Sequence, residues 1–187
     1  MSRAFITFLL FPIFLSACTA VEFEEVKPKS GKEYSEFPKE FIGEYYDIKD
    51  KDTLKITKES FLYGDKNSKF HLTGNLRQDS NPSMVLKKID DLYILNLMSI
   101  KDKSWTIIPF QKTGKNISVY YISMENDSLT KDVANEYTEE RLKLLESITA
   151  VDINTDSTKF TVNPNDKEFK LMIKNGFFEK ILVFAPL

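Results

Sequence analysis

Cysteine and histidine are almost absent from this 187-residue chain, which has one of each, Cys18 and His71. A single cysteine excludes a disulfide within the chain, so the fold must be stable through packing alone. One cysteine and one histidine cannot supply the ligands of a conventional structural zinc site. Any histidine-dependent nucleophilic triad would have to use His71. This residue alternates with Phe70 and Leu72, so we expect it to point outward from a strand.

Other catalytic signatures are also missing. The sequence has no Gly-x-Gly-x-x-Gly, P-loop or Gly-x-Ser-x-Gly motif. What remains are three acidic pairs in expected turns or at a helix start: Asp90-Asp91, Asp50 with Asp52, and Glu139-Glu140. Turn chemistry and the helix dipole account for each pair. We therefore expect no enzymatic activity, no cofactor and no metal.

The charged residues show no excess of either sign. The chain has 26 Lys and Arg against 28 Asp and Glu, with a net charge of −2. A nucleic-acid-binding domain usually carries a basic face, so we expect no nucleic acid partner. About 170 residues follow the apolar segment at the N-terminus (residues 4–15 and Leu15-Ser16-Ala17-Cys18). This length is typical of one domain with a sizeable core.

The one long apolar run lies at the N-terminus. Arg3 and the amino terminus are followed by the charge-free residues 4–15 and then by Leu15-Ser16-Ala17-Cys18. This tetrapeptide resembles the lipobox of bacterial lipoproteins at each of its four positions. The resemblance implies that residues 1–17 are a signal peptide, cut between Ala17 and Cys18, and that the Cys18 thiol carries diacylglycerol.

Two other interpretations of this segment remain open. Residues 4–21 could be a retained transmembrane helix, although they contain Pro12 and only just reach the roughly 20 residues that a span needs. The segment could also be an ordinary secretory signal, which would leave Cys18 as an incidental thiol.

Residues 18–36 are predicted to be a flexible tether, since they are rich in Glu, Lys and Ser and show no sustained apolar period. Extended, about 18 residues would reach roughly 60 Å at about 3.3 Å each. Thr19 is not the Asp that is associated with inner-membrane retention in some Gram-negative lipoproteins. This favours a lipid-anchored location on the outer membrane, on its periplasmic or its exposed face.

From Phe41 onward, apolar residues mostly alternate with polar ones, which is typical of half-buried strands. Strands are predicted at 45–48, 53–57, 61–63, 69–74, 84–86, 92–98, 105–110, 117–124, 150–153, 159–162 and 179–184. Helices are predicted over 138–147 and after an Asn163 cap, with Pro164 at the first helical position and Asn175-Gly176 at the end. The expected fold is one mainly β (α+β) domain over 37–187. It is an antiparallel meander that closes into a barrel or half-barrel, with two short helices in its C-terminal third.

The start of this domain resembles a known opening. Residues 37–45 (FPKEFIGEY) are similar to the short helix and Gly-x-Trp that begin lipocalin-like barrels, with Tyr45 in the place of the Trp. The resemblance implies that Tyr45 plugs the closed end of the barrel and that Gly43 allows close approach of the chain.

Two classes of function follow. The first is a membrane-anchored envelope lipoprotein with a non-catalytic interaction or structural role, which docks a protein or glycan partner and has a packed interior. The alternative is a lipocalin-like carrier of a small apolar ligand. A barrel filled by large side chains leaves no room for a ligand. The abundance of aromatic residues, with 15 Phe and 8 Tyr, favours the first class.

Overall fold

The computed structural model describes residues 20–49, 51–64, 72–76, 83–99, 101–124, 131–154 and 159–187, with the backbone alone for 131–136. The predicted signal peptide, Cys18, Thr19, Asp50 and His71 lie outside the described residues. No helix in the described part of the chain is both long and apolar enough to cross a membrane.

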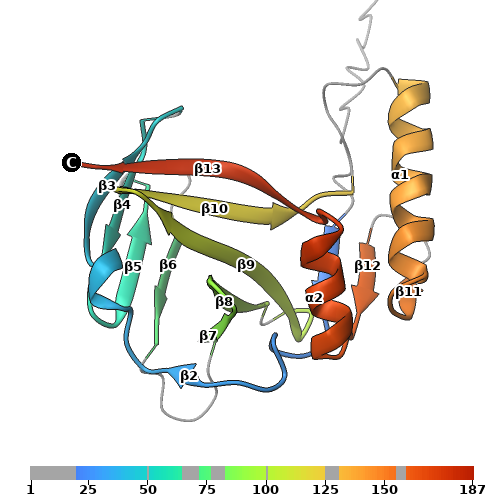
Figure 1. The fold of residues 1–187 in the computed structure, drawn as a ribbon, viewed down its shortest axis with the longest axis horizontal. Coiled ribbons are helices and arrows are strands. Elements are labelled where there is room, and N and C mark those ends of the chain that lie inside the picture. Colours follow the sequence, from blue (N-terminus) through green and yellow to red (C-terminus); the bar gives the residue numbers. More distant parts are fainter. Residues whose placement is uncertain are drawn as a thin grey trace, which may run out of the picture.

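The described residues form strands, two α-helices and one 3-10 helix (Figure 1). In chain order these are β1 (Ala20–Phe23), β2 (Glu33–Tyr34), η1 (Lys39–Phe41), β3 (Gly43–Asp47), β4 (Thr53–Ile56), β5 (Ser60–Tyr63), β6 (Leu72–Asn75), β7 (Met84–Ile89), β8 (Leu92–Ser99), β9 (Ser104–Thr113), β10 (Asn116–Ile122), α1 (Lys131–Glu146), β11 (Val151–Ile153), β12 (Lys159–Val162), α2 (Asp166–Lys174) and β13 (Phe178–Pro186).

One continuous sheet joins all of these strands. Its main path runs β11-β12-β1-β9-β10-β13-β3-β4-β5-β6, and β8, β7 and β2 continue from the other side of β9. All pairs are antiparallel except β1 with β12. The sheet curls into a half-barrel, and both helices lie in the C-terminal part, so the predicted fold class is confirmed. In Figure 1, the helices and β12 stand beside one end of the half-barrel, and the C-terminus lies at the opposite side.

Strands β7 and β8 are buried on both faces. Leu86 and Leu95 point into the half-barrel, whereas their neighbours Val85 and Ile94 point to the outer face, which β1, β12 and the helices cover. Because side chains alternate along a strand, these strands separate two hydrophobic clusters. We call the cluster inside the half-barrel the inner core, and the cluster beneath the helices the outer core.

The described part of the predicted tether, residues 20–36, is not a free linker. β1 pairs with β12 and touches β9 at Trp105, and the side chains of Val21 and Phe23 are buried in the outer core. The tether prediction and the predicted domain boundary at Phe37 are therefore wrong for these residues. The alternating Ala20–Phe23 stretch is too short to stand out beside the charged residues that follow it, and its partner strand lies far away in the sequence.

Both helices differ from their predicted starts. The first helix begins at Lys131 rather than Thr138. The prediction began too late because residues 131–137 lack an apolar stripe that would indicate a helix. The second is capped by Asn165 rather than Asn163. The Asn165 side chain accepts from the backbone N–H of Glu168, whose carboxylate accepts from the Asn165 N–H in return, which is a capping box. The predicted end at Asn175-Gly176 is confirmed.

Candidate functional site

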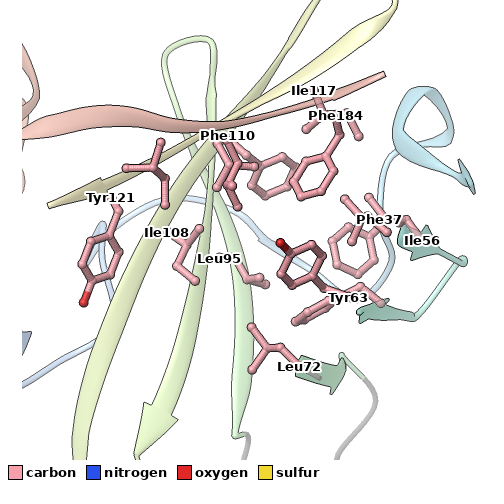
Figure 2. A pocket seen from close by; sticks show the side chains of 15 residues that line it. Phe37, Ile56, Tyr63, Leu72, Leu95, Ile108, Phe110, Ile117, Tyr121 and Phe184 are labelled. Carbon is pink, nitrogen blue, oxygen red and sulfur yellow. The ribbon is translucent and has the colours of Figure 1, made fainter. Parts of the chain in front are cut away.

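The half-barrel encloses an apolar pocket with a volume of about 310 Å³. Figure 2 shows the side chains that line it. They are Phe37, Leu54, Ile56, Phe61, Tyr63, Leu72, Leu95, Ile108, Phe110, Ile117, Val119, Tyr121, Ile181, Leu182 and Phe184. Every one is aliphatic or aromatic, so the pocket offers a ligand hydrophobic contact and no charge.

The alternation of side chains along each strand builds this lining. Ile117, Val119 and Tyr121 come from successive inward positions of β10, and Ile108 and Phe110 do the same on β9. The period-two pattern that predicts these strands thus also predicts which residues face inward. It does not predict how far the opposite walls stand apart.

A β-bulge adds one residue to the lining. Val119 pairs with Leu182, but Tyr120 pairs with Lys180, so Ile181 has no partner on β10. A bulge turns the extra side chain out of the normal alternation. Ile181 and Leu182, although adjacent in sequence, therefore both line the pocket.

The deep end of the pocket is closed by aromatic rings. Phe41 meets Tyr93 and Phe110 edge to face, with ring centroids 5.1 and 5.0 Å apart, and Phe37 lies 6.5 Å from Phe110. Such edge-on arrangements are favourable because the positive ring edge faces the negative ring face. All four side chains are buried, so they form an aromatic base to the pocket.

Tyr45 is buried in the same cluster. Its hydroxyl donates to the Phe41 carbonyl over 3.1 Å. Lys112 covers the ring, with Nζ 4.7 Å from its centroid and 3.0 Å from the hydroxyl oxygen. Gly43 has φ +153°, and a β-carbon there would lie 3.5 Å from the Tyr45 ring. Tyr45 thus packs beside the aromatic rings at the base of the pocket, and a β-carbon at Gly43 would meet its ring at an ordinary contact distance.

In the part of the chain that the structure describes, the other end of the pocket is open. Its rim includes Leu72 and Ile181, whose side chains are 37% and 48% exposed. In Figure 2, Tyr121 lies at one end of the pocket, and Phe37 and Ile56 lie at the other. The pocket is therefore one-ended, with a buried aromatic base and a partly exposed apolar mouth.

The only polar atoms on the lining side chains are the hydroxyls of Tyr63 and Tyr121. Tyr63 is held in place: its hydroxyl donates to the buried Asp47 carboxylate across 3.5 Å, and its ring packs edge-on against Phe184 at 5.5 Å. Aromatic rings line the pocket at both of its ends, yet the described residues leave a pocket between them, whereas the sequence favours a packed interior.

The structure does not bring the acidic pairs together. Asp90 and Asp91 form the β7–β8 turn, where Asp90 accepts from Lys170 of α2 over 2.9 Å. Asp52 precedes β4, and Glu139 and Glu140 lie exposed on α1. In the part of the chain that the structure describes, no three His, Cys, Asp or Glu residues gather where they could hold a metal ion.

Lys27 is a buried polar residue, and no motif or periodicity in the sequence marks it. Its backbone N–H donates to Asn96 Oδ1 over 2.7 Å, and Asn96 Nδ2 donates to the Lys27 carbonyl over 2.9 Å. The ammonium donates to Asn163 Oδ1 over 2.8 Å, and Asn163 in turn donates to Glu24. Burial lowers the pKa of Lys27 to about 8, and nearby Lys29 adds to the effect.

Comparisons with known proteins returned no match. No protein-family model, no curated protein and no solved structure is similar to this chain. Its function therefore has to be inferred from its own geometry.

Proposed function

We propose that this chain is a lipid-anchored envelope protein without catalytic activity, and that its half-barrel binds an apolar molecule through the pocket of Figure 2. The observation that carries the proposal is a one-ended pocket of about 310 Å³ whose lining is wholly aliphatic and aromatic. Small-molecule sites usually measure about 300–1,000 Å³ and are lined mostly by apolar side chains. The half-barrel meets both conditions.

The lining restricts the ligand class. No charged side chain contributes to the lining, and a polar group buried without a partner costs about 1–3 kcal/mol. The buried part of the ligand is therefore hydrocarbon, and any polar group stays at the mouth beside Leu72 and Ile181. The pocket holds roughly ten groups of about 30 Å³ each, the volume of a water molecule in the liquid.

A matched pair of substitutions on β13 tests this site. Leu182 lines the pocket, whereas its neighbour Val183 does not, and both side chains are half-buried. Leu182→Trp should fill the pocket and lower the affinity for a neutral phenylnaphthylamine dye at least tenfold, which corresponds to about 1.4 kcal/mol. Val183→Trp should bind like the unmodified protein. Unchanged binding by a folded Leu182→Trp variant would refute the pocket as the site.

The anchor is proposed on the lipobox resemblance of Leu15-Ser16-Ala17-Cys18. Cleavage before Cys18 and two or three acyl chains on it would hold the protein stably, since one chain alone anchors only marginally. Thr19 supports placement at the outer membrane. Cys18→Ala should abolish palmitate incorporation and membrane attachment; palmitate labelling that persists in this variant would refute the anchor.

The exposed mouth supports a second candidate, the docking of a partner protein. Leu72 and Ile181 form an apolar rim that could receive a large side chain from a partner. The two candidates differ in what occupies the pocket. A stoichiometric small molecule in native mass spectrometry of the purified protein supports the carrier. Docking is supported if no small molecule is bound and a copurifying protein displaces the added dye from the pocket.

A further inference from the structure

The first described strand ties the N-terminus of the mature protein directly to the sheet. Ala20 pairs with Lys159 and Phe23 with Val162, in the parallel β1–β12 ladder. Val21 and Phe23 are buried in the outer core. Glu22 is also held, because its carboxylate lies 2.8 Å from Lys159 Nζ. The chain is therefore held in the sheet from Ala20 onward.

Only Thr19 separates Ala20 from Cys18. At most about 3.5 Å is gained per extended residue, so the Cα atoms of Cys18 and Ala20 are no more than about 7 Å apart. A bilayer of about 40–45 Å with a hydrocarbon core of about 30 Å has a polar layer of roughly 5–8 Å on each side. The connection to a lipidated Cys18 can barely span this layer.

We propose that the domain of the lipidated protein lies directly against the phospholipid headgroups, with the end of the sheet where β1 and β12 begin facing the bilayer. The inference rests on the proposed lipidation of Cys18. The sequence alone predicts a domain held up to roughly 60 Å from the bilayer on a tether. In the proposed arrangement the domain touches the bilayer, and the first strand fixes its orientation.

Ile153 marks the surface that this orientation brings to the bilayer. It lies on β11, pairs with Phe160 and is 44% exposed. Because β12 alone separates β11 from β1, two strand spacings place Ile153 about 10 Å from β1. An exposed isoleucine at this position can contact the headgroup layer, where amphipathic surfaces commonly bind.

Glu33 marks the opposite end of the molecule along these strands. It is exposed on β2 and follows Lys29 and Ser30, whose backbone N–H groups donate to Asp166 at the start of α2, just past the end of β12. In Figure 1, β2 lies at the bottom, whereas β1 begins above it. The two positions are therefore a pair of exposed residues, Ile153 near the proposed membrane surface and Glu33 far from it.

The full lipidated protein offers a direct test. Cys18 is the only cysteine, and lipidation consumes its thiol, so Ile153→Cys and Glu33→Cys each supply one site for a fluorophore. Each fluorophore-labelled protein is placed in vesicles of phosphatidylcholine and phosphatidylglycerol that contain nitroxide-headgroup lipid. We expect loss of most of the emission at residue 153 and little loss at residue 33. Equal quenching at both positions would overturn the proposal.

A linker variant separates orientation from anchoring. Inserting a Gly-Ser linker of about 20 residues between Thr19 and Ala20 adds roughly 25 Å of mean span and leaves the lipobox intact. Quenching at residue 153 should then fall to the level at residue 33, and persistent quenching would overturn the proposal. Palmitate incorporation is measured first and separates the anchor from the orientation. If palmitate is incorporated but quenching does not differ between the two positions, the orientation alone is refuted. If no palmitate is incorporated, both the anchor and the orientation are refuted.

Discussion

At the scale of single residues, Lys27 is a buried cation whose ionisation is coupled to folding. Its ammonium hydrogen-bonds Asn163 inside the protein, while its backbone is bonded on both sides by Asn96. These bonds compensate part of the cost of removing a cation from water. They do not compensate all of it, because the pKa of Lys27 stays lowered from 10.5 to about 8.

The lowered pKa of Lys27 predicts how stability changes with pH. The folded protein releases this proton near pH 8, whereas the unfolded chain keeps it until about pH 10.5. Between these values the unfolded state binds more protons, so the free energy of unfolding should rise with pH, by at most about 3 kcal/mol. In urea unfolding, the unmodified protein should show this rise in the free energy of unfolding with pH, and Lys27→Met should lack it. Lys174→Met, at an exposed position of α2, should show the same rise as the unmodified protein. Parallel curves for all three proteins would contradict the prediction.

Gly74 on β6 lies where a side chain would meet Met84 of β7 and Phe61 of the neighbouring strand β5. A β-carbon at this position would lie 2.5 Å from Met84 Sδ and 2.7 Å from the Phe61 ring. Gly74→Ala should therefore lower the free energy of unfolding by about 1–3 kcal/mol, as overpacked cores do. In Gly74→Ala/Met84→Ala the new methyl enters the space that Met84 leaves, so the double variant should cost less than the sum of the two single variants. Additivity within about 0.5 kcal/mol would show that the two positions do not interact.

At the scale of elements, local chemistry predicted most of the strands. The predicted strand at 159–162 coincides with β12, and β4, β5 and β8 differ from their predictions by one residue. These segments alternate clearly and end at turns. β1 and β2 were missed because each is short and takes its stability from a distant partner, β12 and β7 respectively. A local pattern carries no information about such a pairing.

The candidate site was predictable in its chemistry but not in its volume. Alternation identifies the inward residues, yet the gap between the walls depends on the curl of the sheet and on the bulge at Ile181. Nothing in the sequence around Ile181 marks a bulge. A single extra residue there shifts one side chain to the other face, so one position of β13 helps to shape the mouth.

The bulge gives a prediction for the mouth. Ile181→Lys places a charge where the ligand enters, and losing the contact of a partly buried isoleucine removes about 1–2 kcal/mol, or about tenfold in dye affinity. Stability should change by no more than about 0.5 kcal/mol, because the side chain is 48% exposed. Ile48→Lys, at an isoleucine that is 45% exposed and does not line the pocket, should leave binding unchanged. Equal loss of affinity in both variants would exclude a specific role for the mouth.

At the scale of the whole molecule, one sheet serves two cores. The inner core shapes the pocket, and the outer core fixes β1, β12 and both helices to the back of β7–β9. Asp166 at the start of α2 strengthens this attachment by accepting from the backbone N–H groups of Lys29 and Ser30 over 2.6 and 3.0 Å. The N-terminal segment is therefore part of the folded unit, and the strand that would lead to the anchor also completes the outer core.

This arrangement predicts where the domain can be truncated. A chain that starts at Phe37 loses β1, with Val21 and Phe23, and the Lys27 cluster. Burying each large apolar side chain contributes roughly 1.5–3 kcal/mol, so the loss of about 5 kcal/mol reaches the lower end of ordinary domain stability, about 5–15 kcal/mol. Residues 20–187 should unfold cooperatively in urea. Residues 37–187 should show no cooperative transition and should bind a dye for exposed hydrophobic surface.

A point substitution isolates the role of β1 from the effect of shortening the chain. Phe23 is fully buried against Phe169, with ring centroids 6.1 Å apart, so Phe23→Ala in residues 20–187 should cost about 3–5 kcal/mol. Glu33→Ala, at an exposed position of β2, should cost no more than about 0.5 kcal/mol. If residues 20–187 and 37–187 unfold at the same urea concentration, β1 contributes nothing to the folded unit. The first strand would then be free to act as the tether that the sequence predicts, and the contact between the domain and the bilayer would lose its basis.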